Sequence, residues 1–250
     1  MNLILLEPGE VQADGVACLR DERAEHVRSV LRAAPGDCLR VGVVDGAVGE
    51  AVVLTDNGAE LCLQCRWIGA PPAAPRVDLL LAMPRPKVMN RLWPTVATVG
   101  VGRIMIVRAW KSERPYFDSH MLEPAHVRRR LIEGLQQARD TRLPRVSVHR
   151  QFKKFMEDEL ADFGPYALRL VAHPGAGDFP HGQLRELGAE ARVLVAVGPE
   201  GGWTEYELEQ FAARGFERVG CGPRVLRTEV ACSVLLVLAN EALNEASMPD

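Results

Sequence analysis

Hydrophobic and polar residues alternate in two different ways along the chain, and the change falls after residue 67. Before it, short apolar runs are separated by the turn signals Asp45-Gly46 and Asp56-Asn57-Gly58, which predict β-hairpins. Short strands joined by tight turns are typical of a small β-barrel. A helix with Asp21 as its N-cap is expected at 21–32. We expect the strands of this region at 3–6, 39–44, 48–54 and 61–67.

Residues 69–75 are prolines and small residues, so they predict a linker. Beyond the linker, strand and helix patterns alternate, which predicts parallel βαβ units with helices on both faces of one sheet. We therefore expect an α/β protein with a β-barrel domain at 1–70 and a parallel-sheet domain at 71–250. The expected strands lie at 77–82, 104–109, 146–148, 167–172, 193–197 and 216–219, and the expected helices at 87–99, 123–139, 152–160, 204–213 and beyond 229.

The composition is that of an ordinary globular protein, with 47% apolar and 25% charged residues. No transmembrane span or signal peptide is expected, because the apolar runs are too short and no basic segment precedes the first one. The six cysteines lie mostly in apolar segments, which favours a reduced, cytoplasmic protein. Cys62 and Cys65 have CxxC spacing, but no second pair completes a metal site, so we expect both to be structural and no metal.

The charge is unevenly distributed along the chain, although the net charge is only −3. Residues 76–155 hold 17 basic and 6 acidic side chains, whereas the segments on either side of them are acidic. A basic segment of this kind predicts a localised surface for a polyanion such as RNA. The alternative is a solvated helix face whose charges pair with the acidic segments.

Two glycine-rich loops follow predicted strands near the C-terminus, Gly198-Pro199-Glu200-Gly201-Gly202 and Gly220-Cys221-Gly222-Pro223, and His173-Pro174-Gly175 ends a third strand. Ligands of α/β proteins bind outside the carboxyl ends of parallel strands, so the three loops predict one ligand site. A single loop of this kind would indicate only a tight turn. The first loop lacks the Gly-Lys-Ser/Thr ending of a phosphate loop and the spacing of a dinucleotide fingerprint. Its Glu200 favours a cationic or hydroxyl-bearing ligand.

The motifs VGPEGGWTEYE at 197–207 and CGPRVLRTE at 221–229 resemble those of the RsmE family of 16S ribosomal RNA uridine N3-methyltransferases, in the SPOUT superfamily. Weaker similarities lie elsewhere. Residues 26–32 with Pro35-Gly36-Asp37 are similar to the signature of the family's PUA-like RNA-binding domain, and residues 136–144 to a segment near its centre.

The resemblance implies a parallel sheet with a deep trefoil knot, an N-terminal PUA-like β-barrel, a homodimer, and S-adenosylmethionine as the cofactor. It also implies that backbone groups of the glycine-rich loops bind the adenosine, with Leu226 against the adenine ring. The implied cofactor-binding residues are His173, Pro174, Val197, Gly198, Pro199, Glu200, Gly201, Gly202, Cys221, Gly222, Leu226 and Arg227.

Methyl transfer to uracil N3 requires that donor and acceptor be aligned and that the deprotonated base be stabilised. We expect Arg227 or Arg224 to stabilise the uracil anion, and Glu200 or Glu229 to orient the cofactor or a water molecule. The alternative for Glu229 is a structural carboxylate at a helix N-terminus. The alternative for Arg224 is a contact with an RNA phosphate.

The RNA, 16S ribosomal RNA or the assembled small subunit, is expected to lie across the basic segment. Two other functions stay open: a non-catalytic or differently targeted RNA-binding protein with the same fold, and an unrelated small-molecule enzyme that uses the same pocket. The expected phosphate contacts are Arg28, Arg32, Arg128, Arg129, Arg130, Arg142, Arg145, Lys153 and Lys154.

Overall fold

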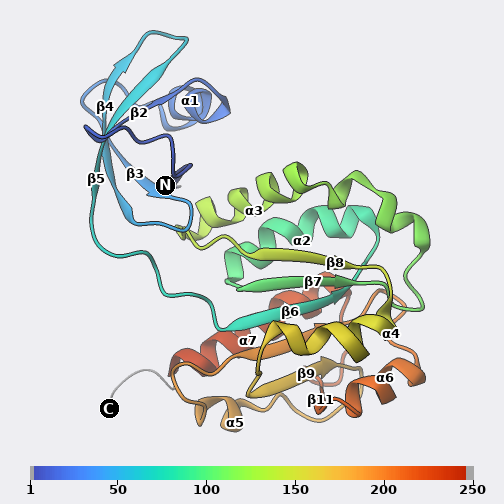
Figure 1. Cartoon of the computed structure of the whole chain (residues 1–250). Helices are drawn as coiled ribbons and strands as arrows, with labels where there is room; N and C mark the ends of the chain where they lie inside the picture. Colours follow the sequence, from blue (N-terminus) through green and yellow to red (C-terminus); the bar gives the residue numbers. More distant parts are fainter. Residues whose placement is uncertain (1–2, 246–250) are drawn as a thin grey trace. The chain divides into compact units, whose positions relative to one another are not determined.

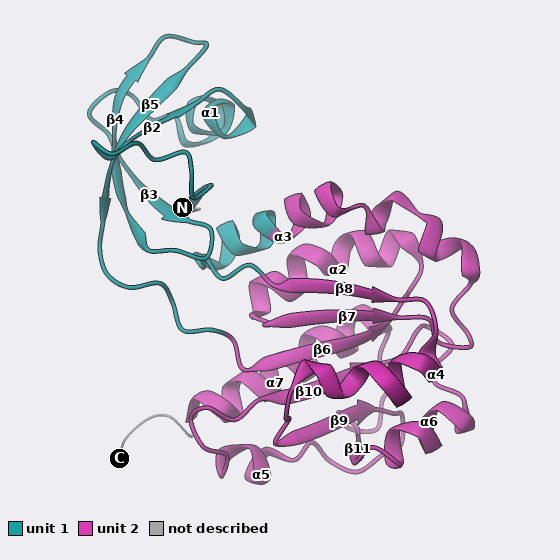
Figure 2. Cartoon of the chain, in the orientation of Figure 1, with its two compact units in different colours: residues 1–74, 132–143 teal, residues 75–131, 144–250 magenta. Residues whose placement is uncertain are grey.

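The computed structural model describes residues 3–245, which form two compact units (Figure 1, Figure 2). Unit 1 comprises Met1–Ala74 together with Ile132–Leu143, and unit 2 comprises Pro75–Leu131 together with Pro144–Asp250. The division therefore passes through helix α3 (Pro124–Ala138), whose C-terminal part is coloured with unit 1 in Figure 2. No helix within residues 3–245 is long and apolar enough to cross a membrane.

Unit 1 contains a five-stranded mixed sheet with the order β1-β3-β4-β5-β2. The pair β1–β3 is parallel, and the other pairs are antiparallel. Helix α1 (Glu22–His26) begins where the sequence predicts, because the Asp21 carboxylate accepts a hydrogen bond of 3.0 Å from the Arg23 amide. A π-helical turn, Val27–Leu31, continues it. The strands are β1 (Ile4–Leu6), β2 (Val16–Leu19), β3 (Cys38–Val43), β4 (Val48–Asp56) and β5 (Leu61–Trp67).

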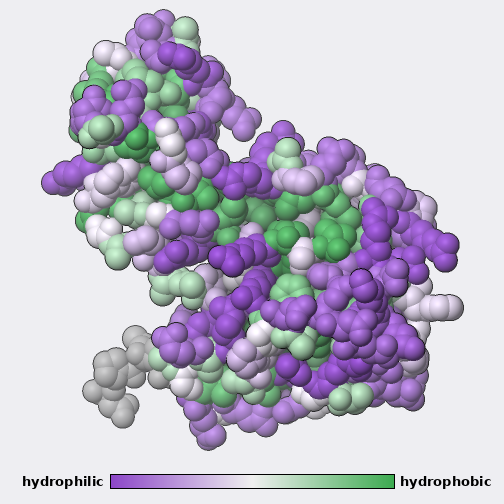
Figure 3. All heavy atoms as spheres, in the orientation of Figure 1, coloured by the Kyte–Doolittle hydropathy of each residue, from purple (hydrophilic) through white to green (hydrophobic). Residues whose placement is uncertain are grey.

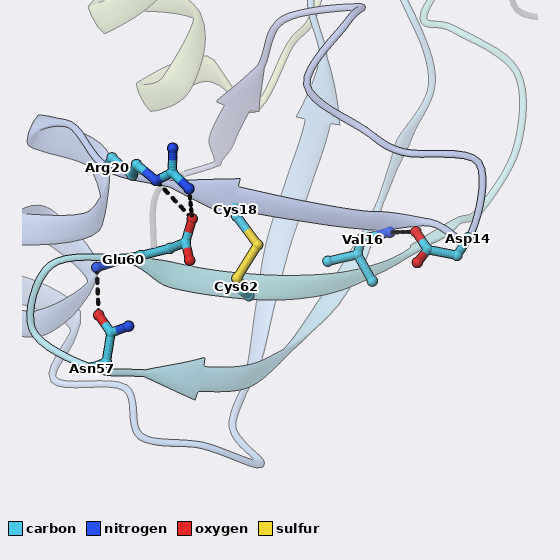
Figure 4. Close-up of a disulfide and its surroundings, with 7 residues drawn as sticks. All are labelled: Asp14, Val16, Cys18, Arg20, Asn57, Glu60 and Cys62. Carbon is cyan, nitrogen blue, oxygen red and sulfur yellow. Dashed lines mark hydrogen bonds and ion pairs between the residues drawn. A yellow bond between two sulfur atoms is a disulfide. The ribbon is translucent and has the colours of Figure 1, made fainter.

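Strand β2 was not predicted, and it changes the expectation for the cysteines. Its antiparallel pairing with β5 places Cys18 opposite Cys62, and the two form a disulfide (Figure 4). The expectation that all six cysteines are reduced is therefore wrong for this pair. The pairing depends on the register of two strands far apart in the sequence, which spacing alone does not reveal. The two sulfurs also lie within 4.8 Å of a Glu60 carboxylate oxygen, but they are bonded to each other and so are not thiolate ligands for a metal.

Unit 2 is built on a six-stranded sheet with the order β11-β9-β10-β6-β7-β8. Every pair of neighbouring strands is parallel, which confirms the predicted α/β architecture. Strands β6 and β10 are buried along their whole length, as expected for central strands of a sheet covered on both faces. The strands are β6 (Val77–Ala82), β7 (Arg103–Val107), β8 (Arg145–His149), β9 (Leu168–Ala172), β10 (Val193–Val197) and β11 (Phe216–Val219).

Helices cover both faces of this sheet because successive strand residues point to opposite sides. Leu80 and Ala82 of β6 share a core cluster with residues of α4 and α6, whereas α7 packs on the other face against β6 and β10 (Figure 1). Helix α2 continues through Pro94, as the sequence pattern predicts. Helix α5 was not predicted. Besides the first part of α3, the α-helices of unit 2 are α2 (Pro86–Val99), α4 (Phe152–Lys154, followed by the π-helical turn Phe155–Glu159), α5 (His181–Arg185), α6 (Glu205–Ala212) and α7 (Thr228–Glu245). Hydrophilic residues cover the visible surface over α4 and α6 (Figure 3).

The order of the strands positions the loops that matter for function. The chain enters the sheet at β6, adds β7 and β8 on one side, and then crosses to β9 on the other. Strand β10 is then inserted between β9 and β6, and β11 is added at the edge. The carboxyl ends of β9, β10 and β11 consequently lie at one edge of the sheet, together with that of β6.

Candidate cofactor pocket

A pocket of about 820 Å³ lies at the carboxyl ends of these strands, within unit 2. Residues after β9, β10 and β11 line it, and residues after β6 and β7 complete it. The structure therefore brings together all twelve residues predicted to bind the cofactor. Glu229 and Arg224, the remaining candidates for catalysis, line the same pocket.

The glycines of the first loop allow the backbone to pass close to other groups. A Cβ atom added to Gly198 would lie 3.2 Å from Nε1 of Trp203, and that indole is packed against Phe152 and Phe211. The indole has little room to move away. Gly202 has a φ of 69°, in the left-handed region where a side chain is strained. The loop therefore requires glycine at both positions.

The end of this loop is held by the start of helix α6. The side chain of Thr204 accepts a hydrogen bond from the Glu207 amide, and the Glu207 carboxylate accepts one of 2.7 Å from the Thr204 amide. This reciprocal pair is a capping box, which is read directly from the Thr-x-x-Glu spacing. The capping box fixes where the loop ends and α6 begins.

One buried polar atom in the pocket lacks a partner. Trp203 lines the pocket and is only 6% exposed, and its Nε1 has no hydrogen-bond acceptor among the residues that the structure describes. Leaving a buried donor unsatisfied is costly, and such atoms in native proteins call for an explanation. An acceptor on a bound ligand would satisfy this indole N–H.

The two candidate carboxylates join neighbouring elements. Oε1 of Glu200 accepts a hydrogen bond of 3.0 Å from the Arg85 amide, so it ties the first loop to the residue that precedes α2. Oε1 of Glu229 lies 3.3 Å from the Arg91 guanidinium of α2. The pairing of Glu229 favours the structural alternative for that residue, because its charge is already opposed by an arginine.

Arg224 and Arg227 differ from these carboxylates. Both are exposed and line the pocket, and within residues 3–245 their side chains have no hydrogen bond or ion pair. Cys221 lies beside them in the second loop, where burial raises the pKa of its thiol and keeps it uncharged. Within the described residues, the pocket therefore presents two cations that are available to a ligand, Arg224 and Arg227, beside the uncharged thiol of Cys221.

Sequence reasoning missed the basic residues that reach the pocket from the other loops. Arg85 follows β6, Arg91 lies in α2, and Lys111 follows β7, and all three line the pocket. The signal was present, because each comes shortly after a predicted strand in the basic segment. The predicted site instead comprised only Val197 at the end of β10, residues of the loops that follow β9, β10 and β11, and Glu229 at the start of α7.

The predicted phosphate contacts are distributed over several elements, and none of the nine, all of which the structure describes, lines the pocket. Arg28, Arg32 and Arg142 belong to unit 1. In unit 2, residues 128–130 are on α3, Arg145 begins β8, and residues 153–154 are on α4.

Several of these nine side chains already have a partner. Lys154 lies 3.0 Å from Glu159, and Arg28 lies 2.9 Å from Asp56. Nε of Arg142 donates a hydrogen bond of 2.6 Å to a backbone carbonyl of the linker. Within the basic segment, Lys154 therefore pairs with a carboxylate of the acidic segment that follows, whereas Arg28 lies outside the basic segment and Arg142 pairs with a carbonyl.

Comparison with known proteins agrees with the fold and the pocket. Residues 71–240 match the family described as an RNA methyltransferase domain. The chain is 32% identical to ribosomal RNA small subunit methyltransferase E of Treponema pallidum, over 96% of this chain and 92% of that protein. The chain belongs to the RsmE family of RNA methyltransferases. The expected family is thereby confirmed, and a 23% identical RsmE of Borreliella burgdorferi covers 98% of the chain.

Two solved structures of methyltransferases share the fold. A putative methyltransferase from Legionella pneumophila, described in complex with S-adenosylmethionine, is 21% identical with a TM-score of 0.78, covering 96% of this chain and 97% of that one. RsmE from Neisseria gonorrhoeae, described as bound to S-adenosylmethionine, is 19% identical with a TM-score of 0.75 and covers 94% and 95%. At these identities the likeness establishes the fold.

Proposed function

We propose that the chain transfers the methyl group of S-adenosylmethionine to N3 of a uridine in the 16S ribosomal RNA of the small subunit. The observation that carries this proposal is the single pocket in which all the predicted cofactor residues meet. Membership of the RsmE family supports the reaction class and the ribosomal RNA substrate. The cofactor in the names of the related structures supports S-adenosylmethionine.

The residues present fit this cofactor. The glycine-rich loops offer backbone groups, the unsatisfied Nε1 of Trp203 offers a donor, and Leu226 and Val197 offer apolar surface for an adenine ring. Glu200 supplies a negative charge at the pocket, which suits a cationic ligand. When bound, S-adenosylmethionine would supply an electrophilic methyl group on a positively charged sulfur.

The chain's own contribution to the chemistry is to favour loss of the uracil N3 proton. A guanidinium beside the base lowers the pKa of N3–H by stabilising the anion, and the proton then passes to solvent. We assign this role to Arg227, with Arg224 as the second candidate. What supports the assignment is that both cations line the pocket and have no partner within the described residues.

Replacement of Arg227 tests this assignment. Arg227→Ala is expected to lower kcat about 10²- to 10³-fold, as for removal of other groups that stabilise a developing anion. The measurement is transfer of tritiated methyl groups to undermethylated small subunits, with naked RNA in parallel. Binding of S-adenosylmethionine, followed by calorimetry, shows separately whether Arg227 also contacts the cofactor, as the family resemblance implies, and Arg227→Lys serves as the variant that keeps the charge. Near-normal turnover by Arg227→Ala would overturn the assignment.

The same measurements separate the alternatives. A wild-type protein that binds RNA but not S-adenosylmethionine would be a non-catalytic RNA-binding protein. A wild-type protein that binds neither would favour an unrelated small-molecule enzyme.

We also propose the finer architecture that the family resemblance implies, with a PUA-like RNA-binding domain at 1–70 and a knotted methyltransferase domain at 71–250. What supports a trefoil knot is that β10 is inserted between β9 and β6, and that α7 returns beneath it. There the Thr228 hydroxyl donates a hydrogen bond of 3.2 Å to the Gly198 carbonyl.

A homodimer is part of the same proposal. Val230 and Val237 are 41% and 50% exposed, and they lie seven residues apart on one face of α7. Exposed apolar residues on one helix face support contact with a second copy. Light scattering after size exclusion is expected to give twice the mass of one chain.

A further inference from the structure

Trp110 stands out among the tryptophans of unit 2. It follows β7 and is 85% exposed, whereas Trp93 and Trp203 are 0% and 6% exposed. Within residues 3–245 its indole makes no hydrogen bond and no ring contact. A large aromatic side chain left in water has no role in holding the fold.

The backbone beneath this indole is fixed. The Trp110 amide donates a hydrogen bond of 2.7 Å to Oε1 of Glu207, a carboxylate that is only 2% exposed. The same carboxylate caps α6, so it joins the start of that helix to the loop after β7. The exposure of Trp110 is therefore a property of an ordered loop.

The two residues after Trp110 are held as well. Nζ of Lys111 donates a hydrogen bond of 2.8 Å to the Gly201 carbonyl in the first glycine-rich loop. The buried Ser112 hydroxyl donates one of 2.8 Å to the Met83 carbonyl at the end of β6. Through Lys111, which lines the pocket, the loop that carries Trp110 is attached to the rim of that pocket.

Basic side chains occur on this loop and on the pocket rim to which it is attached. Arg85 and Lys111 are exposed and line the pocket, and Arg114 is exposed four residues after Trp110. An exposed aromatic ring among cations is the combination that binds single-stranded RNA, because bases stack on the ring while the cations contact phosphates. A purely apolar contact with a protein partner would not require these basic residues.

We propose that Trp110 is a stacking platform for a base of the RNA, next to the uridine that enters the pocket, and that Lys111 and Arg85 contact the adjoining phosphates. This proposal rests on the proposed function and names a positioning residue for it. Because the backbone that carries the indole is already held, little backbone entropy is lost when a base stacks on it. The stacked base would hold the strand in one register and leave the neighbouring uridine over the pocket.

Kinetics of Trp110→Ala, Trp110→Phe and the wild type test the proposal on undermethylated small subunits. Trp110→Ala is expected to raise KM for the subunit about 5- to 100-fold, the range for loss of one stacked base, with kcat changed less than about 3-fold. Trp110→Phe keeps a ring and is expected to restore most of the affinity. Tyr206→Ala is the matched control, because Tyr206 is an exposed aromatic residue of α6 that does not line the pocket.

Binding measured without turnover separates this proposal from the proposed function. The probe is a fluorescein-labelled single-stranded oligoribonucleotide containing uridines, and its affinity for Trp110→Ala is expected to fall by the same factor. If the wild type binds this RNA but transfers no methyl groups, the proposed function fails, and the binding data alone still decide the role of Trp110. Unchanged KM and RNA affinity in Trp110→Ala would overturn the platform. Loss of S-adenosylmethionine binding, of thermal stability or of the oligomer in this variant would do the same, because it would assign Trp110 to the pocket, the fold or a contact between copies.

Discussion

The cofactor pocket and the predicted phosphate contacts differ in what surrounds their charges. In the pocket, Arg227 is exposed and has no partner within residues 3–245. Among the predicted phosphate contacts, Lys154 lies 3.0 Å from Glu159 and Arg28 lies 2.9 Å from Asp56. The pocket thus presents charge to a ligand, while part of the basic segment is neutralised by its own chain.

The difference reflects the kind of signal from which each prediction was made. The pocket was predicted from motifs, and a motif constrains the path of the backbone as well as the identity of the residues. The phosphate contacts were predicted from a local excess of basic residues, which says nothing of the carboxylates that tertiary folding brings beside them. Exposed ion pairs of this kind are weak, so they reduce the availability of a cation without abolishing it.

The largest effect on cofactor binding is expected from filling the first glycine-rich loop. Gly198→Val would press against the fixed Trp203 indole, and overpacking of this size is expected to weaken S-adenosylmethionine binding about 10- to 100-fold. Calorimetry measures the affinity, and the unfolding temperature shows whether the fold survives. Gly188→Ala is the control, because a Cβ atom at that position meets nothing within 4 Å. Equal affinities of Gly198→Val and Gly188→Ala for S-adenosylmethionine would show that the first glycine-rich loop does not form the cofactor site.

A smaller effect is expected from Trp203→Phe, which removes the unsatisfied indole N–H. Affinity for S-adenosylmethionine is expected to fall roughly 2- to 12-fold, the worth of one hydrogen bond, while the unfolding temperature of the free protein stays the same or rises. Cofactor affinity falls while the stability of the free protein does not, because the indole N–H of Trp203 is satisfied only when the cofactor is bound. A variant that loses stability without losing affinity would show that Nε1 has no ligand acceptor.

The smallest effect is expected at the predicted phosphate contacts, which lie outside the pocket. A hydrogen bond from Lys154, and a further one from His149, lowers the pKa of Glu159, so this carboxylate is charged at neutral pH. Glu159→Gln is expected to release Lys154 and to strengthen RNA binding about 2- to 5-fold at low salt, because an exposed ion pair is worth up to about 1 kcal/mol. The affinity should also depend more steeply on salt. Asp162→Asn, which removes a carboxylate charge with no ion pair to a predicted RNA contact, is the control. If RNA affinity does not respond to Glu159→Gln, Lys154 is not an RNA contact.

Much of unit 2 could be predicted from the sequence, because its signals are local. Strands β10 and β11 have the predicted bounds, and the Thr-x-x-Glu spacing fixes the start of α6. Glycine-rich turns at the ends of apolar runs placed the pocket at the carboxyl edge of the sheet. Even Pro94 did not mislead the prediction of α2, because the apolar positions continue beyond it.

What could not be predicted depends on pairings distant in the sequence. Strand β2 is short and pairs with β5 across more than forty residues, so neither the strand nor the disulfide of Cys18 and Cys62 has a local signal. The insertion of β10 between β9 and β6 likewise depends on how strands distant in the sequence are ordered in the sheet. The same reason hid the contributions of Arg85 and Lys111 to the pocket, and the acidic partners of Arg28 and Lys154.

The late insertion of β10 has a consequence for how the protein is made. The pocket needs both Arg85 and Leu235, so it cannot form on a nascent chain until the second of these residues has left the ribosome. Strand β10 begins about 110 residues after β6 ends, so at about 5–20 residues per second β6 has emerged without its neighbour β10 for roughly 6–22 s. Throughout that interval one edge of a strand that is apolar apart from Asp78 is unpaired, which makes it a binding site for chaperones and a risk for aggregation. Synthesis of the enzyme is therefore expected to depend more on chaperones than that of a protein whose sheet is assembled in chain order.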